Sequence, residues 1–413
     1  MKKTTISVIG IGRVGLPLAL FIANKEFNVF GIDNNEKKIE LLKKGQMPFI
    51  EEGADRLLKK YINNSFLPTT DYSSVHKSEI MILTLGTPVD SNMDPVYDQI
   101  NQVLEKIYQY FKKNQLLILR STISPRTTLY IKEFIEKRTK FKIGINFFLA
   151  YCPERIAEGK ALEELKSIPQ IIGGVDKESG KKAADFFQKL GIRVNISDSV
   201  SAELAKLFTN MYRYISFAMA NEFMVIAESF YRNIYEITDL VNKDYKRGGL
   251  SLPGLTGGPC LFKDGFFLIN ENPYLDLIVA SWKINEATPL FLIRKLRERI
   301  RLSNKKVAIL GLAFKPEIDD IRESLSFKLR KALLREHAQI SLHDPFVKEY
   351  GGGATLDLNK ALEGAEVVFV ATRHKFYEKN KRKILKSLNK NCFICDIWNV
   401  FGTNKLIFRV GSI

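Results

Sequence analysis

The sequence has few residues of the kinds that build metal centres and disulfide frameworks. Its 413 residues include only four cysteines and four histidines, so a structural zinc site has little support. Cys392 and Cys395 form a CxxC pair, but they lie in the alternating, strand-like run NCFICDIW. We interpret both as packing residues, with redox or zinc use as the less favoured alternative. We therefore expect no metal and no disulfide framework.

Long uncharged apolar runs are also missing. No stretch of 18 or more uncharged apolar residues occurs, so we expect no membrane span. The start, MKKTTISVIGIGRVGLPLALFIANKE, has the basic head and apolar run of a secretion signal. However, Arg13 and the glycines interrupt that run, and no small-x-small cleavage site follows. These observations predict a soluble, cytoplasmic protein.

Acidic residues are too few to balance the basic ones, which leaves a net charge of +17. Such a charge suits anionic partners, and it does not by itself distinguish nucleic acid, anionic lipid and phosphorylated small molecules. The basic residues are spread along the chain, which is typical of a solvated surface. Nothing in the sequence has the pattern of a known nucleic-acid-binding module, so we expect no nucleic-acid partner.

The first 33 residues have the pattern of a dinucleotide-binding βαβ unit. A β-branched apolar run, residues 5–10, leads into GIGRVG and the helical pattern LPLALFIANKE, and the short run NVFGID ends in an acid. Gly10, Gly12 and Gly15 allow a tight turn, close approach of a pyrophosphate, and packing of the helix on the strand. We expect this loop, including Val14, to bind NAD, with Asp33 accepting hydrogen bonds from a ribose diol and disfavouring the 2′-phosphate of NADP.

Three further apolar runs end in polar loops. They lead to Gly86 and Thr87, to Ser121 and Thr122, and to Glu154. Ligands of doubly wound sheets bind at the carboxyl ends of the strands. We therefore expect these loops to rim the same cleft as the glycine loop, with Gly86, Thr87 and Thr122 near the cofactor.

The later chain repeats this plan of strand, helix and strand. The runs KKVAILGLAFK, AQISLHDP, GAEVVFVATRHK and NCFICDIWNV echo the first domain in order. The second loop has Lys315 where the third glycine would stand, so it should hold a different phosphate from that of a dinucleotide. We predict an α/β protein with two Rossmann-like doubly wound domains, residues 1–195 and 305–413, joined by a central helical domain, residues 196–304.

Two long helices in the central segment carry polar residues on apolar faces. Lys206 and Asn210 are four residues apart on the first helix, so they share a face, and such a pair can hold an oxyanion. The alternative is an ordinary surface lysine. The second long helix is interrupted by Pro289. Long apolar helices between two domains also predict a homodimer interface, and a monomer with an internal helical core is the alternative.

Cys260 stands on the glycine-rich segment GGPCLFKD, four residues before Asp264. A thiol in such a loop beside a dinucleotide domain can be a nucleophile. Thiolate addition to an aldehyde, loss of hydride and hydrolysis would give an acid. Asp264 or a glutamate would be the base, and Lys206 and Asn210 the oxyanion donors. Glu154 and Glu158 are candidates for the glutamate, although surface glutamates are common.

These segments together resemble the UDP-glucose/GDP-mannose dehydrogenase family, the nucleotide-sugar 6-dehydrogenases. The resemblance covers nearly the whole chain, and its motifs come in the family's order. They are GIGRVGLPLA, LGTPVD, RSTISPRTT, CPERIAEGKALEEL, AELAKLFTNMYR, ANE, GGPCLFKD and LGLAFKPEIDDIRES.

The resemblance implies a four-electron oxidation at C6 of a nucleotide sugar, with two NAD consumed, in a homodimeric enzyme of polysaccharide biosynthesis. Cys260 would be the nucleophile, and Asp264 would help to activate water. The other implied catalytic residues are Lys206, Asn210, Thr122, Glu158 and Glu154. The implied substrate contacts are Glu154, Lys206, Asn210, Arg247, Gly257, Lys315 and Arg322, with Arg247 supplied to the neighbouring subunit.

The sequence departs from the family pattern in two places. Pro259 precedes the cysteine where the family commonly has serine, and CPERIAEG mixes features of N-acetylhexosamine-type and glucose-type members. The sugar and the base therefore stay open. Three other interpretations also stay open. One is a two-electron NAD-dependent hydroxyacid dehydrogenase, which would need neither Cys260 nor a second Rossmann unit. The others are a non-catalytic basic nucleotide-binding protein and a catalytically silent member of the family, which the intact set of polar residues disfavours.

Overall fold

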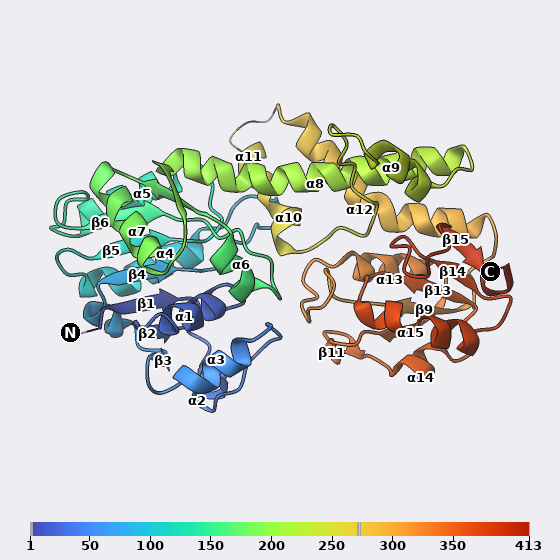
Figure 1. Ribbon diagram of the computed structural model, residues 1–413, viewed down its shortest axis with the longest axis horizontal. Helices are drawn as coiled ribbons and strands as arrows, with labels where there is room; N and C mark the ends of the chain where they lie inside the picture. The colour runs from blue at the N-terminus through green and yellow to red at the C-terminus, as the bar shows by residue number, and fades with distance from the viewer. Residues whose placement is uncertain (1–2, 271, 273, 413) are drawn as a thin grey trace. The chain divides into compact units, whose positions relative to one another are not determined.

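The computed structural model describes residues 3–270, 272 and 274–412, which form two compact units (Figure 1). Residues 3–209 with 266–270 and 272 make up the first unit. Residues 210–265 with 274–412 make up the second. The 31-residue helix α8 (Ser199–Ser229) supplies residues to both units.

The first unit is built on an eight-stranded sheet in the order β3-β2-β1-β4-β5-β6-β7-β8. Neighbouring strands are parallel except β6 and β7, which pair antiparallel. The order of the first six strands, with β1 in the middle, is that of a doubly wound dinucleotide-binding sheet. The strands are β1 (Thr5–Ile9), β2 (Asn28–Ile32), β3 (Phe66–Thr69), β4 (Ile80–Leu83), β5 (Leu116–Leu119), β6 (Phe148–Tyr151), β7 (Gln170–Gly174) and β8 (Val194–Asp198).

Helices cover both faces of this sheet, and alternate residues of the strands belong to different apolar clusters. In β1, Val8 packs in the cluster with α1 and α7, whereas Ile9 packs in the cluster with α4 and α5. This burial on both faces explains why the strands read as continuous apolar runs. The helices are α1 (Gly15–Ala23), α2 (Glu36–Lys43), α3 (Ala54–Tyr61), α4 (Asp98–Ile107), α5 (Thr127–Arg138), α6 (Ala161–Ser167), α7 (Lys177–Lys189) and α11 (Phe266–Ile269), with 3₁₀ turns Tyr72–Lys77 and Tyr108–Tyr110.

The second unit contains a five-stranded sheet in the order β10-β9-β13-β14-β15. All pairs are parallel except β14 and β15. The strands are β9 (Lys306–Leu310), β10 (Gln339–His343), β13 (Val367–Val370), β14 (Phe393–Cys395) and β15 (Ile407–Arg409), and β11 (Glu349–Tyr350) pairs with β12 (Gly353–Ala354).

The two faces of the second sheet again face different helices. Ile309 packs in a cluster with α12, α13 and the last turns of α8, whereas Leu310 packs with α14 and α15. Pro289 lies inside α12, and the helix continues through it, contrary to the expected interruption. The helices are α9 (Ile234–Asn242), α10 (Pro259–Asp264), α12 (Asp276–Arg297), α13 (Leu325–Arg335), α14 (Leu358–Leu362) and α15 (Lys375–Ser387), with a 3₁₀ turn Val410–Ser412.

The predicted fold class is confirmed. Two mostly parallel sheets, each covered by helices on both faces, are connected through long central helices. Across the residues that the structure describes, none of the helices has both the length and the apolar stretch required to span a bilayer.

A glycine-rich loop, residues 253–258, is packed tightly inside the second unit. A Cβ added to Gly254 would lie 2.3 Å from the ring of Trp398, whose indole N–H donates to the Ala371 carbonyl at 3.0 Å. The buried Asn221 of α8 holds Gly254 from its other side, because its amide accepts from the Gly254 N–H at 2.9 Å and donates to the Gly254 carbonyl at 3.1 Å. The loop therefore has no room for a side chain at this residue.

We expect Gly254→Ala to destabilise the protein by about 1–3 kcal/mol, since the new methyl group must displace the Trp398 ring. Urea unfolding followed by tryptophan fluorescence measures the loss. The matched control is Gly351→Ala in the same unit, where nothing lies within 4 Å of the added Cβ. The control should change the free energy of unfolding by less than about 0.5 kcal/mol. Equal losses in the two variants would contradict the packing described here.

Candidate functional site

The glycine loop between β1 and α1 has the geometry that a bound dinucleotide requires. Gly10 has a φ of +91°, and a Cβ there would lie 2.9 Å from the Thr84 carbonyl oxygen. A Cβ at Gly15 would lie 2.3 Å from the Gly10 carbonyl oxygen. Gly12, in contrast, faces open space, with nothing within 4 Å of an added Cβ. The first and third glycines thus close the turn, and the second leaves the backbone open to a pyrophosphate.

Asp33 follows β2 directly and is buried. Its carboxylate accepts from the Asn35 N–H at 3.0 Å and from the Lys38 ammonium at 2.7 Å. Each carboxylate oxygen has a second lone pair, so both can still accept from a ribose diol. Lys38 is a partner of Asp33 that the sequence reasoning missed.

The loops after β4 and β5 are tied to each other at the carboxyl edge of the sheet. The Thr87 hydroxyl donates to the Thr122 carbonyl at 2.6 Å, and the Ser121 hydroxyl donates to the Leu85 carbonyl at 2.6 Å. Gly86 is exposed and lies between Leu85 and Thr87, the two residues of its loop that make these hydrogen bonds. The structure therefore brings Gly86, Thr87 and Thr122 together.

A buried ion pair fixes Glu154 after β6. The guanidinium of Arg120, only 2% exposed, donates through Nε to Glu154 Oε2 at 2.8 Å and through Nη1 to Gln170 Oε1 at 2.8 Å. The other oxygen of Glu154 accepts from the N–H groups of Arg155 and Ile156 at 2.8 and 3.0 Å. Both oxygens of Glu154 are thus used to hold the loop that continues to Glu158.

The backbone on both sides of Glu158 is also held by carboxylates. Glu51 is buried and accepts from the N–H groups of Gly159 and Ala161 at 2.8 and 2.7 Å. Glu164 accepts from the Ala157 N–H at 2.6 Å. Glu158 itself is half-buried. Its position is thus set by three carboxylates, Glu51, Glu154 and Glu164.

Lys206 and Asn210 lie one turn apart on α8, as predicted. Lys206 belongs to the first unit and is only 8% exposed. It forms no salt bridge with any residue that the structure describes. A buried ammonium without a carboxylate partner is available to bind an oxyanion.

Asn210 and Asp264 form a buried pair in the second unit. The Asn210 amide donates to Asp264 Oδ2 at 2.6 Å, and the Lys263 ammonium lies 3.0 Å from Asp264 Oδ1. Asp264 is the last residue of α10 and is fully buried. Cys260 lies in the first turn of the same helix, four residues earlier, so the thiol and the carboxylate share a helix face.

Cys260 is the exposed cysteine of this chain, and the other three are buried free thiols. Burial raises the pKa of both Cys152 and Cys392 to about 12, which keeps these thiols protonated at neutral pH. Pro259 is the first residue of α10, where a missing N–H costs nothing, so the departure from serine is compatible with the loop.

The cysteine loop is joined to the loop that carries Lys315 and Arg322. The Gly258 N–H donates to the Glu323 carbonyl at 2.9 Å, and a Cβ at Gly257 would lie 2.4 Å from the same oxygen. Arg322 is exposed, and its Nε donates to the buried Asp320 carboxylate at 3.0 Å. Lys315 is half-buried in the segment between β9 and α13. The structure therefore gathers Gly257 and Arg322 on one side of the second unit.

The second glycine loop, which follows β9 and begins at Gly311, binds a carboxylate of this chain through its backbone N–H groups. Asp344, which follows β10, accepts from the N–H groups of Leu312 and Ala313 at 2.6 and 3.1 Å. Although burial opposes it, hydrogen bonds from His374 and from backbone amides hold the pKa of Asp344 below its usual value. The anion that these amides bind is therefore Asp344.

Arg247 lies apart from the other predicted residues of the second unit. It is exposed, with its guanidinium 5.2 Å from the centre of the Tyr245 ring. It lines a cavity of about 870 Å³ on the apolar faces of α8 and α9, together with Met219 and Phe223. None of Cys260, Asn210, Asp264, Lys315 and Arg322 lines this cavity.

Several residues that shape the site were not predicted from the sequence. Arg120 had a visible signal, since it is a charged residue at the end of an apolar strand and next to Ser121. For Asn221, the only signal in the sequence was its place in the ANE motif. Glu51 had no signal, because it lies more than a hundred residues before the N–H groups that it binds. Among residues 3–270, 272 and 274–412, no cluster of three or more His, Cys, Asp or Glu can hold a metal ion.

Three domain models of one family match the chain. Residues 4–191 match the NAD binding domain of the UDP-glucose/GDP-mannose dehydrogenase family, residues 200–287 its central domain, and residues 308–403 its UDP binding domain. The matched ranges together span most of the chain.

Individual relatives are similar along nearly the whole chain. The UDP-N-acetyl-D-mannosamine dehydrogenase of Methanocaldococcus jannaschii is 32% identical over 96% of this chain and 92% of its own. The enzyme of the same name from Campylobacter jejuni is 30% identical over 92% of this chain and 98% of its own. The solved structure of UDP-D-ManNAc dehydrogenase from Pyrococcus horikoshii is 30% identical, with a TM-score of 0.87 and coverage of 94% of this chain and 93% of that one.

We expect Arg120→Met to destabilise the protein by about 3–5 kcal/mol, because it leaves the buried Glu154 carboxylate without its cation. Thermal and urea unfolding measure the loss. The matched control is Lys137→Met, which removes an exposed pair with Glu133 and should cost less than about 1 kcal/mol. The double variant Arg120→Met/Glu154→Gln should recover part of the loss. The interpretation fails if Arg120→Met is no more costly than the control.

Proposed function

Because the chain belongs to the UDP-glucose/GDP-mannose dehydrogenase family, we propose that it oxidises the C6 hydroxymethyl group of a UDP-sugar to the uronic acid with two NAD. The NAD binding domain that the family implies is present, and the open backbone at Gly12 fits the pyrophosphate. Bound NAD supplies the hydride acceptor. Asp33 favours NAD over NADP, since a 2′-phosphate would meet its carboxylate.

The observation that carries the proposal is the arrangement of α10. This helix presents an exposed thiol, Cys260, in its first turn and a buried, hydrogen-bonded carboxylate, Asp264, in its last. A two-electron dehydrogenase has no use for a nucleophilic thiol. A four-electron enzyme needs a thiol to hold the aldehyde and a carboxylate to help activate water.

Each residue then has a defined part in the reaction. The Cys260 thiolate adds to the aldehyde carbon to form a thiohemiacetal, and loss of a second hydride from that carbon gives a thioester. Water, assisted by Asp264, cleaves the C–S bond and releases the acid and the thiol. Lys206 and Asn210 stabilise the oxyanions that form at the carbonyl oxygen. Thr122 and Glu158 handle water and protons at the carboxyl edge of the first sheet.

The contacts to the nucleotide sugar come from the second unit. Lys315 and Arg322 supply positive charge for the diphosphate, and Gly257 brings the backbone of the cysteine loop to the sugar. We infer UDP-N-acetyl-D-mannosamine as the substrate, because the relatives that match over nearly the whole chain carry that name. The acidic product belongs to the uronic acids from which polysaccharides are made.

Two further parts of the proposal concern assembly and location. The cavity on α8 and α9 is lined by exposed apolar side chains, and burying such a surface favours a homodimer. Arg247 on that surface would then approach the partner's substrate. We also infer a cytoplasmic location, since Cys152, Cys392 and Cys395 are buried free thiols.

NADH formation at 340 nm tests the reaction, with UDP-N-acetylmannosamine, UDP-N-acetylglucosamine, UDP-glucose, UDP-galactose and GDP-mannose as candidates. We expect two NADH for each sugar consumed with the correct substrate. Cys260→Ala should abolish acid formation, because no thioester can form. The adjacent control Pro259→Ser restores the residue common in the family and should keep two NADH per sugar. Unchanged acid formation by Cys260→Ala would support the hydroxyacid-dehydrogenase alternative.

We expect Phe223→Glu to convert the protein from dimer to monomer, because it places a charge on the apolar surface of α8. Sedimentation equilibrium measures the mass of the particle. The matched control is Ile145→Glu, which changes an exposed isoleucine of the first unit that does not line this cavity. A wild-type monomer, or a dimer that both variants retain, would contradict the proposed interface.

A further inference from the structure

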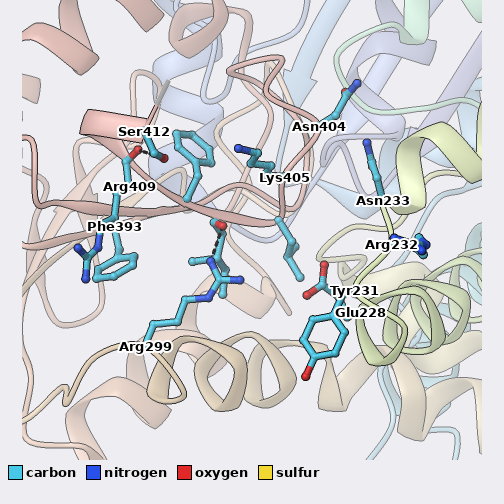
Figure 2. Close-up of a pocket in the computed structure, with 13 residues that line it drawn as sticks. Glu228, Tyr231, Arg232, Asn233, Arg299, Phe393, Asn404, Lys405, Arg409 and Ser412 are labelled. Atoms are coloured by element: carbon cyan, nitrogen blue, oxygen red, sulfur yellow. Dashed lines mark hydrogen bonds between the residues drawn. The ribbon is translucent and has the colours of Figure 1, made fainter.

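The second unit contains a second cavity, remote from the candidate site. It has a volume of about 640 Å³ and lies where α8 and α12 end, beside β15 (Figure 2). None of Cys260, Asn210, Asp264, Lys315 and Arg322 lines it. Glu228, which does, is 18 residues beyond Asn210 on α8, or about 27 Å at 1.5 Å per residue.

Four cations from three segments of the chain line this cavity. Arg232 lies between α8 and α9, and Arg299 follows α12. Lys405 precedes β15, and Arg409 ends it. In Figure 2, Arg409 lies to the left and Arg232 to the right, with Lys405 between them. Residues distant in sequence thus converge on one hollow with the same sign of charge.

The lining supplies little negative charge to balance these cations. Among the residues that the structure describes, Glu228 is the one carboxylate that lines the cavity, so four cations face one described acid. Burial raises the pKa of the Glu228 carboxyl group, and Lys295 and Arg299 only partly oppose the shift. Within the described part of the chain, none of the four cations forms a salt bridge.

Two of the four cations are held in place by their neighbours. Arg299 donates through Nη1 to the Ile407 carbonyl at 2.6 Å, and the Arg409 guanidinium lies 4.8 Å from the centre of the Phe393 ring. These contacts use one N–H of Arg299 and the face of Arg409, so other N–H groups remain for a ligand. Arg232 and Lys405 are exposed and have no such contact among the described residues.

We propose that this cavity binds a small molecule that carries two or more linked phosphates. The planar guanidinium group of arginine can donate two parallel hydrogen bonds to one phosphate group. Three arginines and a lysine can therefore neutralise and bind several phosphate groups, which favours a ligand with more than one. The volume lies within the range of about 300–1,000 Å³ typical of small-molecule sites. The cations gather in one hollow and not along a stripe, which favours a compact polyanion over a nucleic acid strand.

Calorimetric titration with sodium tripolyphosphate, at constant ionic strength, tests the site. The variant Arg232→Gln/Lys405→Gln/Arg409→Gln keeps Arg299, which holds the Ile407 carbonyl, and should weaken binding about ten-fold or more. The matched control Lys381→Gln/Arg382→Gln/Lys383→Gln removes the same charge from exposed residues of α15 that line no part of the cavity. It should bind within about two-fold of the wild type, because only general charge screening changes.

Equal weakening in the two triple variants, or no weakening in either, would overturn the proposal. So would binding of a single-stranded oligonucleotide, but not of tripolyphosphate, that depends on the same three cations. Titration with UDP and with ATP distinguishes a nucleotide from inorganic polyphosphate as the source of the phosphates. If the triple variant does not fold, Lys405→Gln against Lys381→Gln makes the same comparison. No arm uses catalytic turnover, so the outcome is independent of the proposed reaction.

Discussion

The position of Cys260 depends on a loop, residues 253–258, in which three of the six residues are glycine and offer no side chain to hold it. Residues 253–258 are fixed instead by what surrounds their backbone: the Asn221 amide, the Trp398 ring and the Glu323 carbonyl. These three groups come from α8, from the segment after β14 and from the loop before α13. A glycine-rich loop needs this external support, because glycine gives up more conformational freedom on folding than any other residue. The helices and the sheet of the second unit therefore both help to place Cys260.

Buried carboxylates hold the backbone in both units. Glu51 and Glu154 bind N–H groups of the loop that carries Glu158, and Glu203 binds those of Arg126 and Thr128 at the start of α5. A buried backbone N–H group without a hydrogen-bond partner lowers the stability of the fold. A loop has no neighbouring strand whose carbonyl groups could accept from its N–H groups. An acid in a family motif is thus not by itself a proton-transfer group. The occupied oxygens of Glu154 assign it to positioning, whereas no such assignment follows for Glu158.

The sequence predicted the two sheets well and the supporting network poorly. Apolar runs that end in polar loops located β1, β2, β4, β5 and β6, and the repeat of that plan located β9, β10, β13 and β14, since strands buried on both faces have an unmistakable pattern. The short edge strand β3, and β7 and β8 beyond the antiparallel turn, had no comparable signal. Pro289 was expected to interrupt a helix that in fact runs through it, because surrounding packing outweighs one missing hydrogen bond. Pairs such as Arg120 with Gln170 join distant segments, and no local pattern reveals them.

The carboxylate of Asp344 on the backbone N–H groups of Leu312 and Ala313 bears on where the cofactor binds in the proposed reaction. Nothing lies within 4 Å of a Cβ added at Gly12, whereas the N–H groups of Leu312 and Ala313 bind Asp344, so the proposed reaction would use the Gly12 loop as its place for a dinucleotide. An oxidation that removes two hydrides must then use that place twice, with exchange of the spent cofactor in between. During the exchange a free aldehyde could diffuse away or react with amines. In the proposed reaction, a covalent bond to Cys260 would tether the half-oxidised sugar for as long as the exchange lasts, and the second unit would hold the nucleotide end of the same molecule.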